Sequence, residues 1–245
     1  MICACESNNK IANNCIDCAS GKLGIFTDLT ADEIDSLEAF IDKKNSYVAG
    51  QVLIQEEGSV NFSICVNSGY LIIGSYLPNG TRQIYQLITP GETIAFSHKS
   101  QNSNYFVRAI TDVNACILSN STINTLITNV PKIAKRVVEI FNKNTHAYQQ
   151  FLLNSSRKDA TQGLAYLILH IKSKISNVSK LPSEKNRDQN FFPLNQEDMA
   201  DIIGLTKVHV SRVMSQFKKD RIIDYSHRRV EVIDTEKLKD IASYP

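Results

Sequence analysis

The stretch that indicates the fold most clearly is QEDMADIIGLTKVHVSRV, which covers residues 196–213. Asn195 precedes it and is a residue type that caps helix N-termini. The first segment has one apolar face, made by Met199, Ala200 and Ile203. Gly204 follows, and glycine adopts the positive φ that a tight turn between two helices needs. The pattern predicts two short helices joined by a tight turn, a helix-turn-helix.

The second segment of this stretch carries the side chains expected to read DNA. Thr206 is expected to cap it, with Leu205 filling the corner and Val210 and Val213 facing the core. The N-terminal end of the second helix is then turned to solvent, and in a helix-turn-helix this end enters the major groove. The expected DNA-contacting residues are Thr206, Lys207, Val208, His209, Ser211 and Arg212. A plain helical hairpin is the alternative interpretation.

Two β-like runs flank Ser226–Arg229 and predict a hairpin with a basic tip. We call this hairpin the wing. Arg228 and Arg229 at its tip are expected to contact phosphate or the adjacent groove. The net charge of the chain is only +2, but residues 131–245 hold 20 Lys and Arg against 13 Asp and Glu. A basic C-terminal half suits a polyanionic partner, although scattered solvated charge would give the same count.

The N-terminal half has the pattern of a β domain. Short β-like runs lie at residues 50–54, 62–66, 69–74 and 83–88, with Gly- or Pro-containing turn signals between them. Regular short strands at this spacing predict an all-β sandwich or barrel. Before them, Thr30 and Glu33 have the spacing of a helix-capping box. Residues 1–20 are polar and have no apolar period, which indicates a loosely ordered arm.

Pro131 opens a long helical run between these two parts of the chain. Its apolar positions recur at steps of four and three, as in a coiled-coil seam. The seam residues, expected to pair two copies of the chain, are Ile133, Val137, Ile140, Asn144, Ala147 and Phe151. Asn144 would fix the register of such a seam. An amphipathic helix that packs on its own domain is the alternative.

In this order of elements the chain resembles the Crp/Fnr superfamily of bacterial regulators, most closely its Fnr branch. The resemblance rests on Cys15 and Cys18, Cys116, Val130-Pro131 and Ser211-Arg212. It implies an α+β chain with a β-roll sensor domain of the cupin-like, cyclic-nucleotide-binding type, a long dimerisation helix and a winged helix-turn-helix. The expected boundaries are an arm at 1–20, the β-roll at 21–130, the helix at 131–157 and the DNA-binding domain at 158–245.

The resemblance also has departures. The Fnr branch has a further cysteine shortly after the pair, but residues 21–24 read GKLG. Val208 stands where the family often has Glu, so the usual half-site is not expected. The phosphate cradle of the cyclic-nucleotide members is missing around residues 94–98, and Gly91-Glu92 lies too early and is expected to form a turn. A bound cyclic nucleotide is therefore not expected.

The cysteines are the candidates for a cofactor site. Cys15 and Cys18 have metal-ligand spacing, and iron–sulfur clusters are held by four thiolates. By resemblance Cys15, Cys18 and Cys116 would hold a 4Fe-4S cluster, with Cys5 as the candidate fourth ligand and Cys3 as its rival. Zinc, a redox dithiol, or no ligand at all are the alternatives. Cys65 alternates within a β run and is expected to be structural.

The remaining observations limit the function class. Apolar residues make up 42% of the chain and charged residues 21%, an ordinary globular composition. No apolar run is long enough for a membrane helix, and the start does not have the pattern of a secretory signal, so we expect a cytoplasmic protein. No catalytic motif stands out, so an enzyme is not expected.

The sequence thus predicts a homodimeric transcription regulator with double-stranded DNA and RNA polymerase as partners. An iron–sulfur cluster would make it redox- or oxygen-responsive. An effector-free or thiol-switch regulator of the same fold is the alternative. A rival from another class is a small-molecule sensor that acts through a protein partner.

Overall fold

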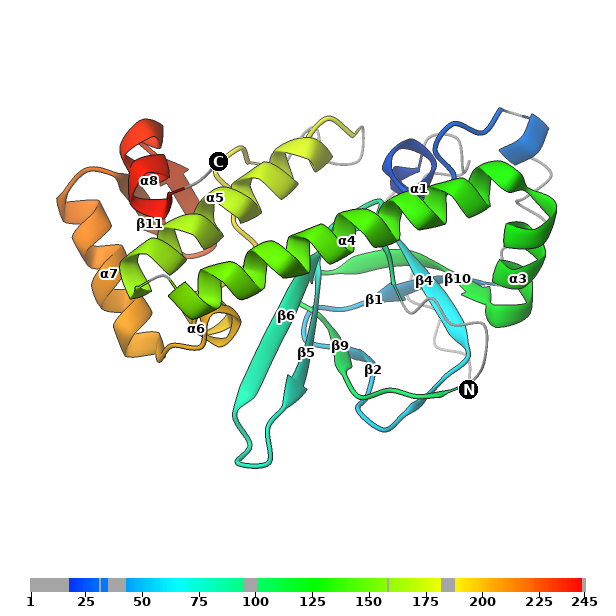
Figure 1. Cartoon of the computed structure of the whole chain (residues 1–245), viewed down its shortest axis with the longest axis horizontal. Helices are drawn as coiled ribbons and strands as arrows, with labels where there is room; N and C mark the ends of the chain where they lie inside the picture. The colour runs from blue at the N-terminus through cyan, green and yellow to red at the C-terminus, as the bar shows by residue number, and fades with distance from the viewer. Residues whose placement is uncertain are drawn as a thin grey trace.

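The computed structural model describes residues 18–30, 32–34, 43–94, 101–157, 159–181 and 188–243. Figure 1 shows the long helix α4 (Pro131–Arg157) running along the molecule, with the strands of residues 43–119 on one side of it and the helices of residues 160–242 gathered near one end. None of the helices in these ranges is both long and apolar enough to cross a bilayer.

The N-terminal domain is a β-roll of antiparallel strands, as expected. One sheet has the order β1 (Lys43–Tyr47), β10 (Val113–Ser119), β4 (Phe62–Ser68), β7 (Thr93–Ile94). The other has the order β2 (Val52–Ile54), β9 (Phe106–Ala109), β5 (Leu71–Tyr76), β6 (Arg82–Ile88). The short strands β3 (Ser59–Val60) and β8 (Gln101–Asn102) pair with each other. Apolar side chains such as Ile64, Val66, Leu71 and Val107 are fully buried in one cluster of this domain.

Three described helical elements belong to the same half of the chain. Helix α1 (Ala19–Leu23) begins at Cys18, whose sulfur accepts the N–H of Gly21 at 3.3 Å. Thr30 and Glu33 form the expected capping box at the start of a helical segment described at residues 32–34. Helix α3 (Asn120–Asn129) leads directly into α4 (Pro131–Arg157).

The C-terminal domain begins with α5 (Ala160–Val178), which Asp159 and Gln162 cap reciprocally. Its inner face is apolar, with Leu164, Leu167, Ile168 and Ile171 all buried. Helices α6 (Gln196–Ile203) and α7 (Lys207–Lys219) follow, then the hairpin β11 (Ile223–Ser226) and β12 (Arg229–Val232), and last α8 (Thr235–Ala242).

The largest apolar core joins the two domains. Tyr70, Ile72 and Ile84 of the β-roll lie in one cluster with Leu164, Phe192 and Met199 of the C-terminal domain. Burial of such side chains is worth about 1.5–3 kcal/mol each. The outer face of the sheet β2-β9-β5-β6 is therefore packed against the helix-turn-helix domain.

The structure corrects the seam predicted on α4. Ile133 is 1% exposed in the single chain and packs with Cys116 and Leu126, so its assignment to a dimer interface is wrong. Val137 and Ile140 pack against the same cluster, and Asn144 and Ala147 line cavities on the side of β6. The side chain of Phe151 lies outside the described part. The sequence could not distinguish packing against the β-roll from pairing, since both need the same period.

A pH dependence of stability follows from His170 on α5. Burial, reinforced by the charges of Lys174 and Lys143 and opposed by Glu92, lowers the pKa of His170 from 6.5 to about 4. Between these values the unfolded chain takes up a proton that the folded chain refuses. We expect the free energy of unfolding to fall by about 2 kcal/mol from about pH 7 to about pH 5.

Chemical denaturation at the two pH values measures this effect, and His170→Gln should remove it. His146→Gln, on an exposed part of α4, is the matched control and should retain it. An identical pH dependence in His170→Gln would show that another group titrates.

Candidate DNA-binding interface

The helix-turn-helix predicted from residues 196–213 is confirmed, with one difference: on the inner face of α6 it is Ile202 that is buried, and the predicted Ile203 is only partly buried. Asn195 accepts the N–H of Asp198 at 2.8 Å, and Asp198 accepts the N–H of Asn195 in return, which fixes the start of α6. Gly204 ends α6 with a φ of 69°. A Cβ there would meet nothing within 4 Å, so glycine is required by the backbone conformation and not by space.

Helix α7 presents its N-terminal end to solvent. The Thr206 hydroxyl accepts the N–H of His209 at 3.3 Å, and Val210 and Val213 are buried beneath the helix. Lys207, His209 and Arg212 are exposed, Ser211 is half-buried, and Val208 is 69% exposed. Of the side chains expected to read DNA, Lys207, Val208, Ser211 and Arg212 line one common surface. This is the geometry that a recognition helix needs.

Two residues extend this surface beyond the sequence prediction. Gln196 at the start of α6 and Ser215 one turn further along α7 line a shallow groove together with Lys207, Val208, Ser211 and Arg212. The Ser215 hydroxyl is held by the carbonyl of Ser211 at 2.8 Å. Ser215 follows Ser211 by four residues, so helical periodicity was the signal that could have identified it.

The wing is formed but differs from the expectation at its tip. Ser226 pairs with Arg229 across the turn, and Arg228 has a φ of 52°. The Arg228 guanidinium donates to the carbonyl of Ile110 in the β-roll at 2.8 Å. Arg229 is exposed and forms an ion pair with Asp188 at 3.0 Å. In this conformation Arg228 is turned toward the sensor domain, so its predicted contact with DNA stays a prediction that requires this hydrogen bond to open.

Comparisons with known proteins agree with this architecture. Residues 163–241 match the family described as Crp-like helix-turn-helix domain, and residues 44–129 match the cyclic nucleotide-binding domain. The chain belongs to the Crp/Fnr superfamily of DNA-binding transcription regulators. It thus has the two domains of a Crp/Fnr regulator in the order expected from its sequence.

Relatives and solved structures extend the match over most of the chain. The transcriptional activator protein FnrL of Cereibacter sphaeroides is 29% identical over 224 residues, which cover 91% of this chain and 89% of that protein. The fumarate and nitrate reduction regulatory protein of Escherichia coli K12 is 21% identical and covers 95% and 92%. The structure of FixK2 from Bradyrhizobium japonicum superimposes with a TM-score of 0.70 at 18% identity over 81% of this chain and 96% of that one, which shows the shared fold.

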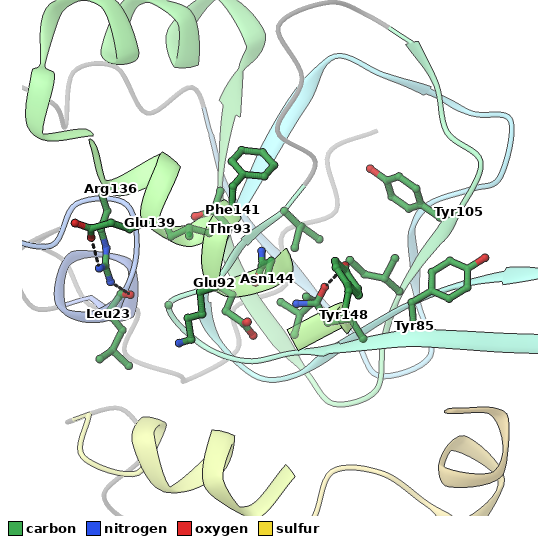
Figure 2. Close-up of a pocket in the computed structure, with 17 residues that line it drawn as sticks. Leu23, Tyr85, Glu92, Thr93, Tyr105, Arg136, Glu139, Phe141, Asn144 and Tyr148 are labelled. Atoms are coloured by element: carbon green, nitrogen blue, oxygen red, sulfur yellow. Dashed lines mark hydrogen bonds and ion pairs between the residues drawn. The ribbon is translucent and has the colours of Figure 1, made fainter. Parts of the chain in front are cut away.

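This Crp/Fnr regulator has a cavity of about 360 Å³ between its β-roll and α4. Figure 2 shows Arg136 at one end of it, with its guanidinium bound to Glu139 and to the carbonyl of Leu23, and Tyr148 bound to Gln86. These contacts fix Arg136 at that end of the cavity. Gly91 adopts a φ of 90° and Glu92 donates its N–H to Thr89, so this pair forms the expected turn. Residues 95–98 of the cradle region lie outside the described part.

Three cysteines of this regulator are described, and all three are buried. Cys116 on β10 lies directly across from Cys65 on β4, and Cys18 caps the neighbouring helix α1. Asn67 donates to the Cys116 sulfur at 3.2 Å and accepts from Ser20 of α1, which links the two segments. Burial raises the pKa of Cys65 to about 12, so this thiol stays protonated. Cys3, Cys5 and Cys15 lie outside the described residues.

The glycine-rich stretch after Cys18 has a structural reason. A Cβ on Gly24 would lie 2.4 Å from the carbonyl oxygen of Gly91 and 2.8 Å from the backbone of Ser20. No larger residue fits there without movement of the backbone, which excludes a cysteine ligand at Gly24 in this conformation. The described ranges contain no group of three or more His, Cys, Asp or Glu side chains arranged to hold a metal ion.

Proposed function

We propose that the chain binds a near-palindromic DNA site as a homodimer, with one α7 in each half-site, and regulates transcription through contact with RNA polymerase. The observation that carries this proposal is the surface formed by Lys207, Val208, Ser211 and Arg212, on a helix whose opposite face is buried in the core. A rigid helix with its N-terminal end displayed is what direct readout of base edges requires. The basic excess of residues 131–245 supplies attraction to phosphate.

Substitution of Arg212 tests whether α7 reads base edges. A guanidinium at this position can bond the O6 and N7 of one guanine together. Arg212→Ala should weaken binding to the specific site by about 1–3 kcal/mol and binding to random duplex by much less. Titration of both duplexes by fluorescence anisotropy at one salt concentration measures the two losses.

Lys219→Ala at the opposite end of α7 is the matched control and should leave the preference for the specific site intact. Equal losses on both duplexes in Arg212→Ala would mean that Arg212 only touches phosphate.

The dimer proposal rests on a different face of α4 from the one predicted by sequence. Four large apolar side chains on this helix are well exposed, namely Val138, Phe141, Tyr148 and Leu152. They follow at steps of three, seven and four, so with Thr145 they form a heptad seam one residue out of phase with the predicted one. A second copy of α4 is the occupant with the same length and period. We call this face the α4 stripe.

Phe141 lies near the centre of the α4 stripe and is half exposed. Phe141→Glu should convert the dimer into a folded monomer, because each seam would then bury two uncompensated carboxylates. Analytical ultracentrifugation measures the mass, and affinity for the full site should fall with it because one subunit reads one half-site.

Gln149→Glu adds the same charge on an exposed position beside the stripe and should stay dimeric. A Phe141→Glu protein that sediments as a dimer would place the interface on another surface.

For the signal, we propose an oxygen-sensitive 4Fe-4S cluster held by Cys15, Cys18, Cys116 and Cys5. Two of these thiols are described. Each sulfur receives a hydrogen bond, Cys18 from the Gly21 N–H and Cys116 from the Asn67 amide. Such donors favour the thiolate form that iron requires. The cluster, when bound, would supply a centre that reacts with oxygen.

The segment that follows Cys18 is tied to α4, and this supports a role in regulation. Arg136 of α4 donates to the carbonyls of Leu23 and Gly24 at 3.1 and 3.0 Å, at the C-terminal end of α1. Lys132 forms an ion pair with Glu33 at 2.9 Å. A change around Cys18 would therefore act on the first turns of the helix that carries the α4 stripe.

The cysteine proposal predicts a brown protein under strict anaerobiosis that bleaches in air and then binds DNA more weakly. Cys15→Ser and Cys116→Ser should each abolish the visible absorption and the bound iron and sulfide. Cys65→Ala, which changes the neighbour of Cys116, is the matched control and should keep them. Colourless anaerobic protein without iron and sulfide would exclude the cluster, and loss of iron in Cys65→Ala but not in Cys5→Ala would reassign the fourth ligand.

A further inference from the structure

A polar clamp joins the β-roll to the helix-turn-helix. Arg82 at the start of β6 donates from Nη2 to Asp198 at 2.8 Å and from Nε to Asp201, both on α6. The side chains of Arg82, Asp198 and Asp201 are only 16%, 6% and 19% exposed. Asp198 is also part of the capping box of α6, so the clamp binds this helix at its capped N-terminal end.

Further contacts extend this clamp to the wing. Beside Arg82, Gln83 donates to the carbonyl of Ile202 at the end of α6. On the neighbouring part of the same face, the ring of Tyr70 lies 5.6 Å from that of Phe191, which bridges to the wing residue Arg229. Arg228 then donates to the Ile110 carbonyl at 2.8 Å, so the wing is tied to the same β-roll as α6.

The recognition helix and the wing are thus in different situations. The N-terminal end of α7 is exposed, whereas the one guanidinium of the wing tip that points inward donates to a backbone carbonyl of the sensor domain. While Nη1 makes that hydrogen bond, the guanidinium is held against the sensor domain, and reaching a phosphate of a bound duplex requires it to swing away. A left-handed φ at Arg228 adds a backbone strain that an L-residue tolerates only where other contacts compensate.

We propose that the β-roll latches the DNA-binding domain by holding α6 through Arg82 and the wing through the Ile110 carbonyl, and that opening this latch releases Arg228 as an additional DNA-phosphate contact. The inference rests on the proposed DNA binding and adds a regulatory contact to it. The sensor sheet thereby controls non-specific affinity for DNA separately from base readout by α7. A signal that shifts β6 relative to α6 would strengthen or release the latch.

The electrostatics make Arg82 the residue to change. Removing the guanidinium leaves two carboxylates of α6 largely buried and unneutralised, and an uncompensated buried charge is strongly unfavourable. Arg82→Glu adds a third carboxylate and drives the contact open, while Arg82→Gln is the milder form. Either change makes the chain more negative, so on charge alone it should weaken DNA binding. A gain of phosphate contacts is therefore not explained by charge.

The salt dependence of binding to a random duplex counts these contacts. Each new phosphate contact steepens the slope of log K against log salt by about 0.9. We expect Arg82→Glu to steepen it by about 0.9 per subunit, with Arg82→Gln between it and the parent. Arg228→Ala alone should leave the parental slope nearly unchanged, and Arg82→Glu/Arg228→Ala should return to it. Circular dichroism melts establish that each variant is folded.

Two results would overturn the latch. A parental slope that becomes shallower in Arg228→Ala would show that Arg228 already contacts phosphate. An unchanged or shallower slope in both folded Arg82 variants would show that the clamp does not hold the wing back. Failure of the parent to bind any duplex would instead remove the proposed DNA binding itself.

Discussion

The orientation of the recognition helix α7 depends on one packed contact. In this contact the outer face of the sheet β2-β9-β5-β6 packs against the helix-turn-helix domain. Tyr70 and Ile84 of the β-roll share a core with Phe192 and Met199, and Arg82 closes the polar edge of that core. Relative motion of domains is the usual expectation unless their interface is large and apolar. Here the interface between the domains is apolar, so α7 moves together with the sensor sheet. A shift of β6 would act directly on α6, because the two elements are in contact.

Helix α4 contacts the other regions to which a function is proposed. One of its faces packs on the β-roll through Ile133, the neighbouring face exposes the α4 stripe, and Arg136 binds the carbonyl end of α1. The segment after Cys18, the proposed dimer contact and the cavity of Figure 2 therefore meet along a single helix. A ligand, a cluster or a partner that shifts α4 would alter all three together.

The sequence predicted what local chemistry determines. The caps Asn195 and Thr206, the turn at Gly204 and the β-roll strands have local signals, and all were found. Ile133 of the predicted α4 seam packs inside the chain instead, because two heptads one residue apart read equally well and only packing against α3 and the β-roll distinguishes them. Arg228 was predicted to face DNA because a hairpin tip is normally exposed, and nothing near it in sequence reveals the Ile110 carbonyl. The position of Cys65 directly across from Cys116 likewise depends on strand register, which cannot be read from the spacing of the cysteines.

Selection of bound duplexes from a random pool tests the central claim most directly. Two α7 helices in a symmetric dimer should enrich inverted half-sites whose centres lie about one helical turn, or 10–10.5 base pairs, apart. The enriched half-site should differ from that of regulators with Glu in place of Val208, because an isopropyl group cannot accept a hydrogen bond from cytosine. Enrichment of paired half-sites at that spacing is the predicted result. A pool that stays random, or that yields single half-sites without fixed spacing, would contradict the account.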